Sequence, residues 1–212
     1  MKLAQMRLAH GWILDGEPES PGRLIAEFIR PAVSAIPSPM AQRLGACRVA
    51  FPHCFANPSH TSEWTEHGHI LEIAAATGGI ADHDIAMEVL SCLGQALWER
   101  LLYDERTAFW KLLDAEIHAG VPGEIDEEAL AAKRRLLAGH AQARSNTLLE
   151  YYGRASFAAT AAEYVHALWH DVSVRTGPDY LPAPQLRRRL ELLARWFPPD
   201  EGYELFAAEP RK

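Results

Sequence analysis

The spacing of apolar residues predicts a helix near the start of the chain. Ser20 and Pro21 suit the cap and the first position of such a helix. Apolar side chains then recur on one helical face, at Leu24, Ile25, Phe28 and Ile29. Pro31 has no backbone N–H to donate, so we expect it to kink or end the helix. The pattern therefore predicts an N-terminal helical segment over residues 1–45.

Two stretches in the region 47–75 instead have the pattern of strands. The first, which ends at Pro52, is short and mostly apolar. The second alternates between two sides, which would place Trp64 and Ile73 on opposite faces of one strand. Gly68 is suited to a bend within this stretch, so a hairpin is an equal alternative. We predict a small front sheet here, packed on helices.

The rest of the chain, from about residue 82, has the spacing of helices. Acidic or hydroxyl side chains suited to helix starts precede apolar positions three and four apart, and Gly or Pro residues close each segment. The predicted helices cover residues 82–102, 104–120, 125–143, 145–174 and 185–197. The long fourth helix either continues through Gly153 or breaks there. The fold class is therefore α+β and predominantly helical, in a single domain over residues 1–212.

Composition and charge narrow the range of partners. The chain has 212 residues, of which 48% are hydrophobic and 23% charged, as in ordinary globular proteins. The formal net charge of −7 argues against nucleic acid or an anionic membrane surface as a partner. The one basic run, at residues 187–189, lies in a predicted helix, where we expect a solvated face. An unidentified protein or peptide is the expected partner.

The sequence favours a cytoplasmic location. No apolar run approaches the roughly 20 residues of a membrane helix, and residues 1–15 have no apolar stretch typical of a signal peptide. The three cysteines, Cys47, Cys54 and Cys92, are odd in number and irregularly spaced. This is no disulfide framework, and it fits a reducing compartment.

No intact motif names a reaction, but one group of residues could bind a metal. Glu163, His166 and His170 lie three and four residues apart, so a helix would align one carboxylate and two imidazoles on one face. The plainer interpretation is that these are histidines of an amphipathic helix without a ligand. His67 and His69 could share one strand face as a weaker metal candidate, or form a polar strand end.

The segment around Cys92 resembles the active-site helix of zincin-type metallopeptidases. That helix typically reads Leu-His-Glu-Leu-Gly-His-Ala-Leu, and its frame is matched here by Leu90, Leu93, Gly94, Ala96 and Leu97. The chemical residues are replaced. Ser91 and Gln95 stand at the positions of the two zinc-binding histidines, and Cys92 stands at that of the general-base glutamate. Because Cys92 lies in an apolar helical stretch, we expect a buried, inert thiol.

The resemblance implies a zincin-like core over about residues 47–172, followed by a C-terminal helix and tail at 183–212. In zincins a strand, often the edge strand that pairs with substrate, precedes the active helix, and the alternating stretch before residue 75 has that place. Many zincins take a third zinc ligand from a glutamate on a later helix, as Glu163 would be. The replaced residues imply a scaffold without ordinary peptidase activity.

Three hypotheses about function follow. The first is a catalytically inactive zincin-like metallopeptidase homologue that acts as a binding or regulatory module and needs no cofactor. The second is a metal-dependent enzyme, with zinc as a candidate ion, whose site has moved to Glu163, His166 and His170. The third is a helical structural or protein-interaction domain with no active site.

Overall fold

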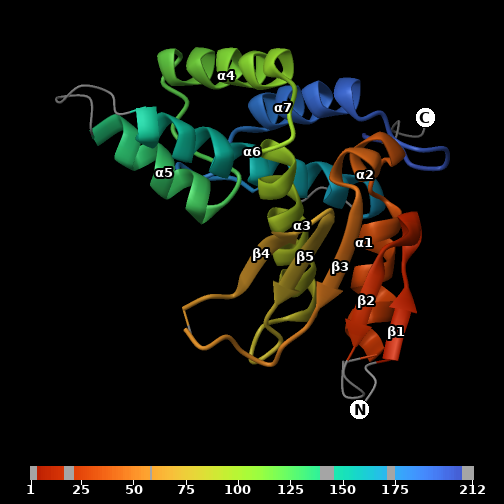
Figure 1. Cartoon of the computed structure of the whole chain (residues 1–212). Helices are drawn as coiled ribbons and strands as arrows, with labels where there is room; N and C mark the ends of the chain where they lie inside the picture. The colour runs from red at the N-terminus through yellow and green to blue at the C-terminus, as the bar shows by residue number, and fades with distance from the viewer. Residues whose placement is uncertain (1–3, 17–21, 58, 139–145, 171–174, 207–212) are drawn as a thin grey trace.

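A computed structural model describes residues 4–16, 22–57, 59–138, 146–170 and 175–206. A five-stranded sheet lies on one side of the molecule and a stack of helices on the other (Figure 1). The predicted α+β class with a predominance of helix is therefore confirmed. Among these residues, no helix combines the length and the apolar character that a membrane span requires.

The sheet is larger than the sequence predicts. Its strands are β1 (Ala4–Arg7), β2 (Ile13–Gly16), β3 (Ala46–Ala50), β4 (Ser62–His67) and β5 (Ile70–Ala75). They lie in the order β1-β2-β3-β5-β4, with β2, β3 and β5 parallel and the two outer strands antiparallel to their neighbours. The predicted sheet over about residues 47–75 thus supplies only three of the five strands.

The predicted helical segment over residues 1–45 was wrong for its first part, because residues 4–16 contain β1 and β2. These strands have only four residues each, too few for a period of two to stand out. Helix follows in three short pieces: a π-helix η2 (Leu24–Ile29), α1 (Arg30–Ser34) and α2 (Ser38–Leu44). The predicted cap, Ser20 and Pro21, lies outside the described residues. At Pro31 the helix continues, with a change from π to α hydrogen bonding.

The hairpin between β4 and β5 corrects the predicted assignment of faces. Gly68 has a φ of +64°, and the two-residue turn brings Trp64 opposite Ile73 on the same face of the sheet. A continuous strand would have separated these side chains, because neighbouring residues of a strand point to opposite faces. The hairpin alternative is therefore confirmed.

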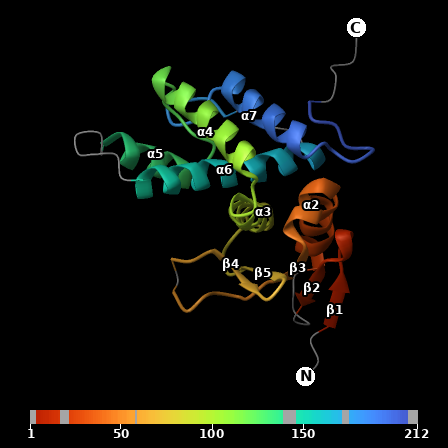
Figure 2. The same cartoon turned by 45° about the horizontal axis from the view of Figure 1, so that its top comes forward.

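Helix α3 (Asp82–Trp98) lies between the sheet and the helices that follow it in the chain, and Figure 2 shows it end-on in this place. It packs against β4 and β5 on one side and against α6 (Asn146–Trp169) on the other. The two helices approach closely at Gly94, because glycine has no side chain. A Cβ atom at this position would lie only 2.7 Å from the backbone oxygen of Ala158. Helix α6 runs unbroken through Gly153, whose missing side chain leaves room for the ring of Trp110.

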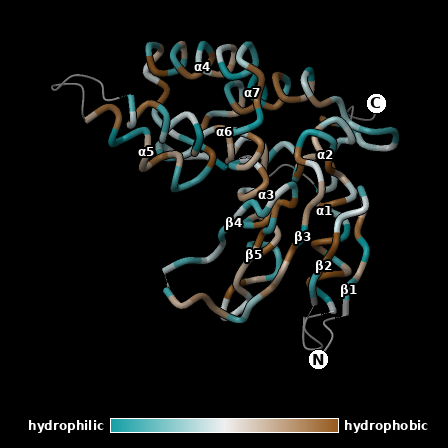
Figure 3. The backbone as a smooth tube through the Cα atoms, viewed as in Figure 1, coloured by the Kyte–Doolittle hydropathy of each residue, from teal (hydrophilic) through white to brown (hydrophobic). Residues whose placement is uncertain are grey.

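Three further helices cover α6: α4 (Tyr103–His118), α5 (Glu127–Ala138) and α7 (Ala183–Trp196). Helices α5 and α7 pack directly on α6, and α4 packs on both α6 and α7. In Figure 3 the outer turns of α4 and α5 carry hydrophilic stretches, whereas the strand β3 is mostly hydrophobic. The predicted helices thus all occur, although α3 ends at Trp98, before the predicted residue 102. The predicted ends of two helices, at residues 143 and 174, lie outside the described residues.

Candidate functional site: a histidine-lined cavity between α3 and α6

A cavity of about 710 Å³ opens beside the contact between α3 and α6. Its walls come from the first half of α3, the second half of α6, the start of α5 and the stretch 175–186. Thr61, the residue before β4, also lines the cavity. The cavity therefore lies where the end of the sheet meets the crossing of two central helices.

Four of the residues singled out from the sequence line this cavity. Ser91 faces it from α3, and Glu163, His166 and His170 face it from the end of α6. The ring of His166 is buried, and its Nδ1 lies 3.7 Å from a carboxylate oxygen of Glu163. His170 is exposed, and its ring stacks on that of His166 with centroids 5.3 Å apart. The sequence therefore correctly grouped these residues on one face.

Sequence reasoning missed His83, which lies in the first turn of α3. Its Nε2 is 3.1 Å from the Nε2 of His166, and its Nδ1 is 3.5 Å from the Oδ1 of Asp84. A signal was available, because His83 precedes Ser91 by eight residues, or about two helical turns. Residues about two turns apart lie on the same face of a helix, so this spacing places His83 on the same face as Ser91, one of the replaced motif positions.

Cys92 and Gln95 lie outside the cavity. Cys92 is buried, and burial raises the pKa of its thiol to about 12. A thiol with this pKa is protonated at neutral pH and is a poor nucleophile. The amide oxygen of Gln95 accepts a hydrogen bond of 3.1 Å from the indole Nε1 of Trp64 on β4. These two side chains therefore serve packing and the contact between α3 and the sheet.

The second histidine pair is also separate from the cavity. His67 and His69 are exposed at the hairpin, and the Nε2 of His67 lies 3.7 Å from a carboxylate oxygen of Glu72. His69 is in the turn rather than in a strand, so the two rings do not share a strand face.

The cavity wall is strongly acidic. Its acidic residues are Asp84, Glu88, Glu124, Asp126, Glu127, Glu128 and Glu163, against one arginine, Arg175. Asp126 directly precedes α5, and its Oδ1 accepts a hydrogen bond of 2.8 Å from the N–H of Ala129 in the first turn of that helix. Burial, together with the charges of Glu128, Glu124 and Glu88, raises the pKa of Asp126 to about 6. A cation is the ligand that this wall favours.

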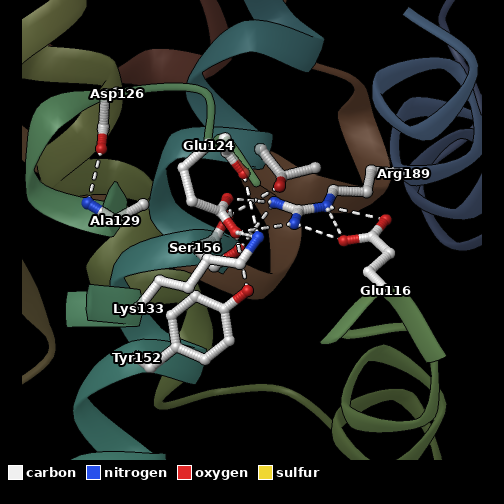
Figure 4. A network of polar contacts seen from close by, with 10 residues as sticks. Glu116, Glu124, Asp126, Ala129, Lys133, Tyr152, Ser156 and Arg189 are labelled. Atoms are coloured by element: carbon white, nitrogen blue, oxygen red, sulfur yellow. Dashed lines mark hydrogen bonds and ion pairs between the residues drawn. The ribbon is translucent and has the colours of Figure 1, made fainter. Parts of the chain in front are cut away.

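A buried ion-pair network adjoins the cavity through Glu124 (Figure 4). Its centre is Arg189 on α7, whose guanidinium contacts Glu116 on α4, Glu124 before α5, and the hydroxyl of Ser156 on α6. Lys133 on α5 lies 3.2 Å from Glu124, which also accepts a hydrogen bond of 2.6 Å from the hydroxyl of Tyr152. The expectation that residues 187–189 form a solvated face was thus wrong for Arg189.

The pKa shifts of Arg189 and Glu124 favour the charged form of both groups. Burial opposes the charged form of Arg189, but the carboxylates of Glu124 and Glu116 outweigh it and raise its pKa. For Glu124, burial likewise favours the neutral form, yet the charge of Arg189 outweighs this effect and lowers the pKa. Each charge compensates the other, so the network has a structural role.

A second, more open hollow of about 860 Å³ lies along α7. Its arginines include Arg187, which forms an exposed ion pair of 2.8 Å with Glu191 one turn further along the same helix. The lining ends at Phe206, where the described part of the chain also ends. It brings together none of the candidate residues, so the histidine-lined cavity is the candidate site.

Comparison of the chain with protein-family models, with curated proteins and with solved structures finds no match. Within the described parts of the chain, no group of three or more His, Cys, Asp or Glu side chains is arranged to hold a metal ion. The chemistry of the cavity is therefore argued from its own geometry.

Proposed function

We propose that the protein is a zincin-like binding module without peptidase chemistry, and that it holds an extended, basic polypeptide segment beside β4. The observation that carries this proposal is that Ser91 and Glu163 line one cavity. In the zincin pattern that this chain resembles, Ser91 has the position of a zinc-binding histidine and Glu163 that of the glutamate ligand from a later helix. They are 72 positions apart in the sequence, so their meeting is not a consequence of local spacing.

The order of elements supports the same proposal. Strand β4 lies at the edge of the sheet, β5 follows it, and α3 comes next along the chain. Among the described residues, no strand pairs with the outer side of β4. Such an edge offers backbone N–H and C=O groups to an extended chain, which is a common mode of peptide recognition. Thr61 links this edge to the rim of the cavity.

The residues at the three replaced positions do not fit a catalytic zinc ion. Serine and glutamine are poor zinc ligands, and the amide of Gln95 is held by Trp64. Cys92 is a buried thiol, which does not supply the carboxylate that would activate water. We therefore expect a bound segment to remain uncleaved.

The charge of the cavity supports a basic partner. The carboxylate of Glu124 is compensated by Arg189 and Lys133, which leaves six of the lining acidic residues against Arg175. A lysine or arginine side chain that enters from a segment on β4 would find opposite charge on most sides. Complementary charge of this kind contributes to specificity and to the rate of association.

Binding of labelled peptides tests this proposal. Two extended ten-residue peptides that differ only in alternating Lys or Glu would be compared by fluorescence anisotropy. We expect the basic peptide to bind more tightly, to lose affinity several-fold with E127Q/E128Q, and to remain intact by mass spectrometry. Glu99→Gln, an exposed change at the end of α3, is the matched control. Equal binding of both peptides, or cleavage of either, would contradict the proposal.

Restoring the replaced ligands tests the scaffold itself. In a His83→Ala background, Ser91→His should add a zinc ligand to the cavity beside Glu163, and Glu163→Ala should then weaken zinc binding. Isothermal titration with zinc chloride measures this. If the restored variant binds no more zinc than its His83→Ala parent, the zincin-like arrangement is wrong.

One observation favours the alternative of a metal-dependent protein with a relocated site. The ring nitrogens of His83 and His166 converge at the cavity, at a place different from that of the peptidase motif. This pair offers two imidazole nitrogens to an ion in the cavity.

A further inference from the structure

We propose that the cavity binds one divalent transition-metal ion, such as zinc, through His83, His166 and His170. This proposal does not depend on the zincin-like scaffold, because none of the three side chains stands at a position of the peptidase motif. It also differs from the site expected from sequence, since His83 replaces Glu163 as a direct ligand.

The first argument is the separation of the two ring nitrogens. Nε2 of His83 and Nε2 of His166 are 3.1 Å apart, although they come from different helices. Two imidazole nitrogens bound to one tetrahedral zinc, each at about 2.0–2.1 Å, lie roughly 3.3 Å apart. An ion therefore fits between the two rings after a shift of a few tenths of an ångström.

The second argument is that each ring has a carboxylate near its other nitrogen. Nδ1 of His83 lies 3.5 Å from Asp84, and Nδ1 of His166 lies 3.7 Å from Glu163. Carboxylates in this place orient metal-binding histidines. When both rings carry their proton on Nδ1, two Nε2 lone pairs face each other, and a cation between them removes their repulsion. When one ring carries its proton on Nε2, that nitrogen donates a hydrogen bond to the other instead.

The third argument is an unsatisfied buried atom. Nδ1 of His166 is buried and has no hydrogen-bond partner, although Glu163 is near. Unpaired polar atoms are uncommon in protein interiors because they have lost their hydrogen bonds to water. A small rotation of the ring toward an ion at Nε2 would let Nδ1 donate to Glu163. Ligand binding would then satisfy both nitrogens of His166.

The third ligand is His170, one helical turn after His166. A His pair four residues apart on a helix is a spacing that binds zinc. The two rings are now stacked at an interplanar angle of 12°, and the centroids of His170 and His83 are 6.2 Å apart. As placed, the three imidazoles among the described residues do not form a complete ligand set, so the exposed side chain of His170 must rotate inward to complete it. The acidic wall favours the positive charge of the ion.

Metal binding by protein without a histidine tag, stripped of metal and titrated with zinc chloride at pH 7.5, tests the proposal. We expect one equivalent per chain, with affinity at least about tenfold lower after His83→Ala or His170→Ala. Cobalt provides a second readout. Its absorption should show nitrogen and oxygen ligands without a thiolate charge-transfer band, which separates this site from exposed Cys54.

Glu163→Gln distinguishes an orienting carboxylate from a direct ligand. We expect affinity to fall by about tenfold or more while the stoichiometry stays at one, because the three imidazoles remain. His69→Ala is the matched control, since it removes an exposed histidine at the hairpin. Its zinc affinity should equal that of the parent protein.

Several results would overturn the proposal. They are the absence of saturable zinc binding, unchanged affinity after His83→Ala, or an equal loss in His69→Ala. Circular dichroism and a thermal melt in EDTA check that each variant is folded. His83 has a side chain 38% exposed and His170 is exposed, so neither substitution removes a buried group. If only a proton lies between the rings, zinc will not bind, and the proposal fails.

Discussion

Two polar regions lie along α6, and they differ in how their charges are compensated. Around Arg189, two carboxylates, a lysine and two hydroxyl groups contact one another within hydrogen-bonding distance, and the guanidinium is fully buried. In the cavity, carboxylates outnumber cations and Nδ1 of His166 has no partner. Glu124 belongs to both regions, but its carboxylate is directed to the network.

This difference separates a structural network from a binding site. Charges that leave water lose their hydration, so a buried group is tolerated where other protein groups replace it. The network meets this condition by itself and joins α4, α5, α6 and α7. Among the described residues, none of its buried side-chain nitrogen and oxygen atoms lacks a hydrogen-bond partner. In the cavity, by contrast, the excess of carboxylates and the unpaired nitrogen of His166 are not compensated by other protein groups, so a ligand can compensate them.

The largest expected effect comes from breaking the compensated region. Arg189→Met would leave the carboxylates of Glu116 and Glu124 buried without their main partner. We expect the free energy of unfolding to fall by about 3–5 kcal/mol, the usual cost of removing one member of a buried ion pair. Urea denaturation followed by circular dichroism measures it.

The neighbouring arginine provides the control for this change. Arg188 is exposed on the same helix, so Arg188→Met should alter the free energy of unfolding by no more than about 0.5 kcal/mol. If both variants lose a similar free energy of unfolding, the buried network contributes no more to stability than an exposed arginine does, and it does not differ from the cavity in the way described.

Asp126 gives a smaller effect of opposite sign. Its pKa is raised from 3.8 to about 6, so the folded protein disfavours the ionised form that predominates at neutral pH. The cost is absent below pH 3.8, grows as the pH rises toward about 6, and is then constant. Asp126→Asn should remove it and stabilise the fold at pH 7.5 by at most about 3 kcal/mol.

Asparagine is a suitable test because it can still accept the hydrogen bond from Ala129 and caps helices as well as aspartate does. The unfolding free energies of parent and variant would be compared at pH 4 and pH 7.5, where we expect the difference to appear only at the higher pH. Asp104→Asn, an exposed change in the first turn of α4, is the control. Destabilisation by Asp126→Asn at pH 7.5 would contradict the prediction.

How far the fold could be predicted from sequence depended on the length of each repeating pattern. Helix α3 and the hairpin of β4 and β5 were found because apolar positions repeat over many residues. Strands β1 and β2 were missed because four residues carry too little pattern, and their place in the sheet depends on pairing with distant β3. Arg189 was misjudged because its partners lie 65 and 73 positions away.

The candidate site was predicted in part for the same reason. Glu163, His166 and His170 were grouped correctly because they share one helix face. His83 is 83 positions from His166, so only the crossing of α3 and α6 reveals their contact. That crossing rests on the close approach of Gly94 to Ala158, a contact between distant positions that no local pattern reveals.

The smallest effect on stability is expected from the cavity itself. In EDTA, His83→Ala should change the free energy of unfolding by no more than about 0.5 kcal/mol, because the partly exposed ring contacts mainly cavity groups. Water can replace it at Nε2 of His166. With zinc present, the parent protein should melt at a higher temperature, since a ligand that binds only the folded state stabilises it, whereas His83→Ala should show a much smaller shift. A loss comparable to that of Arg189→Met, measured in EDTA, would assign the histidine pair to the structural core and not to a binding site.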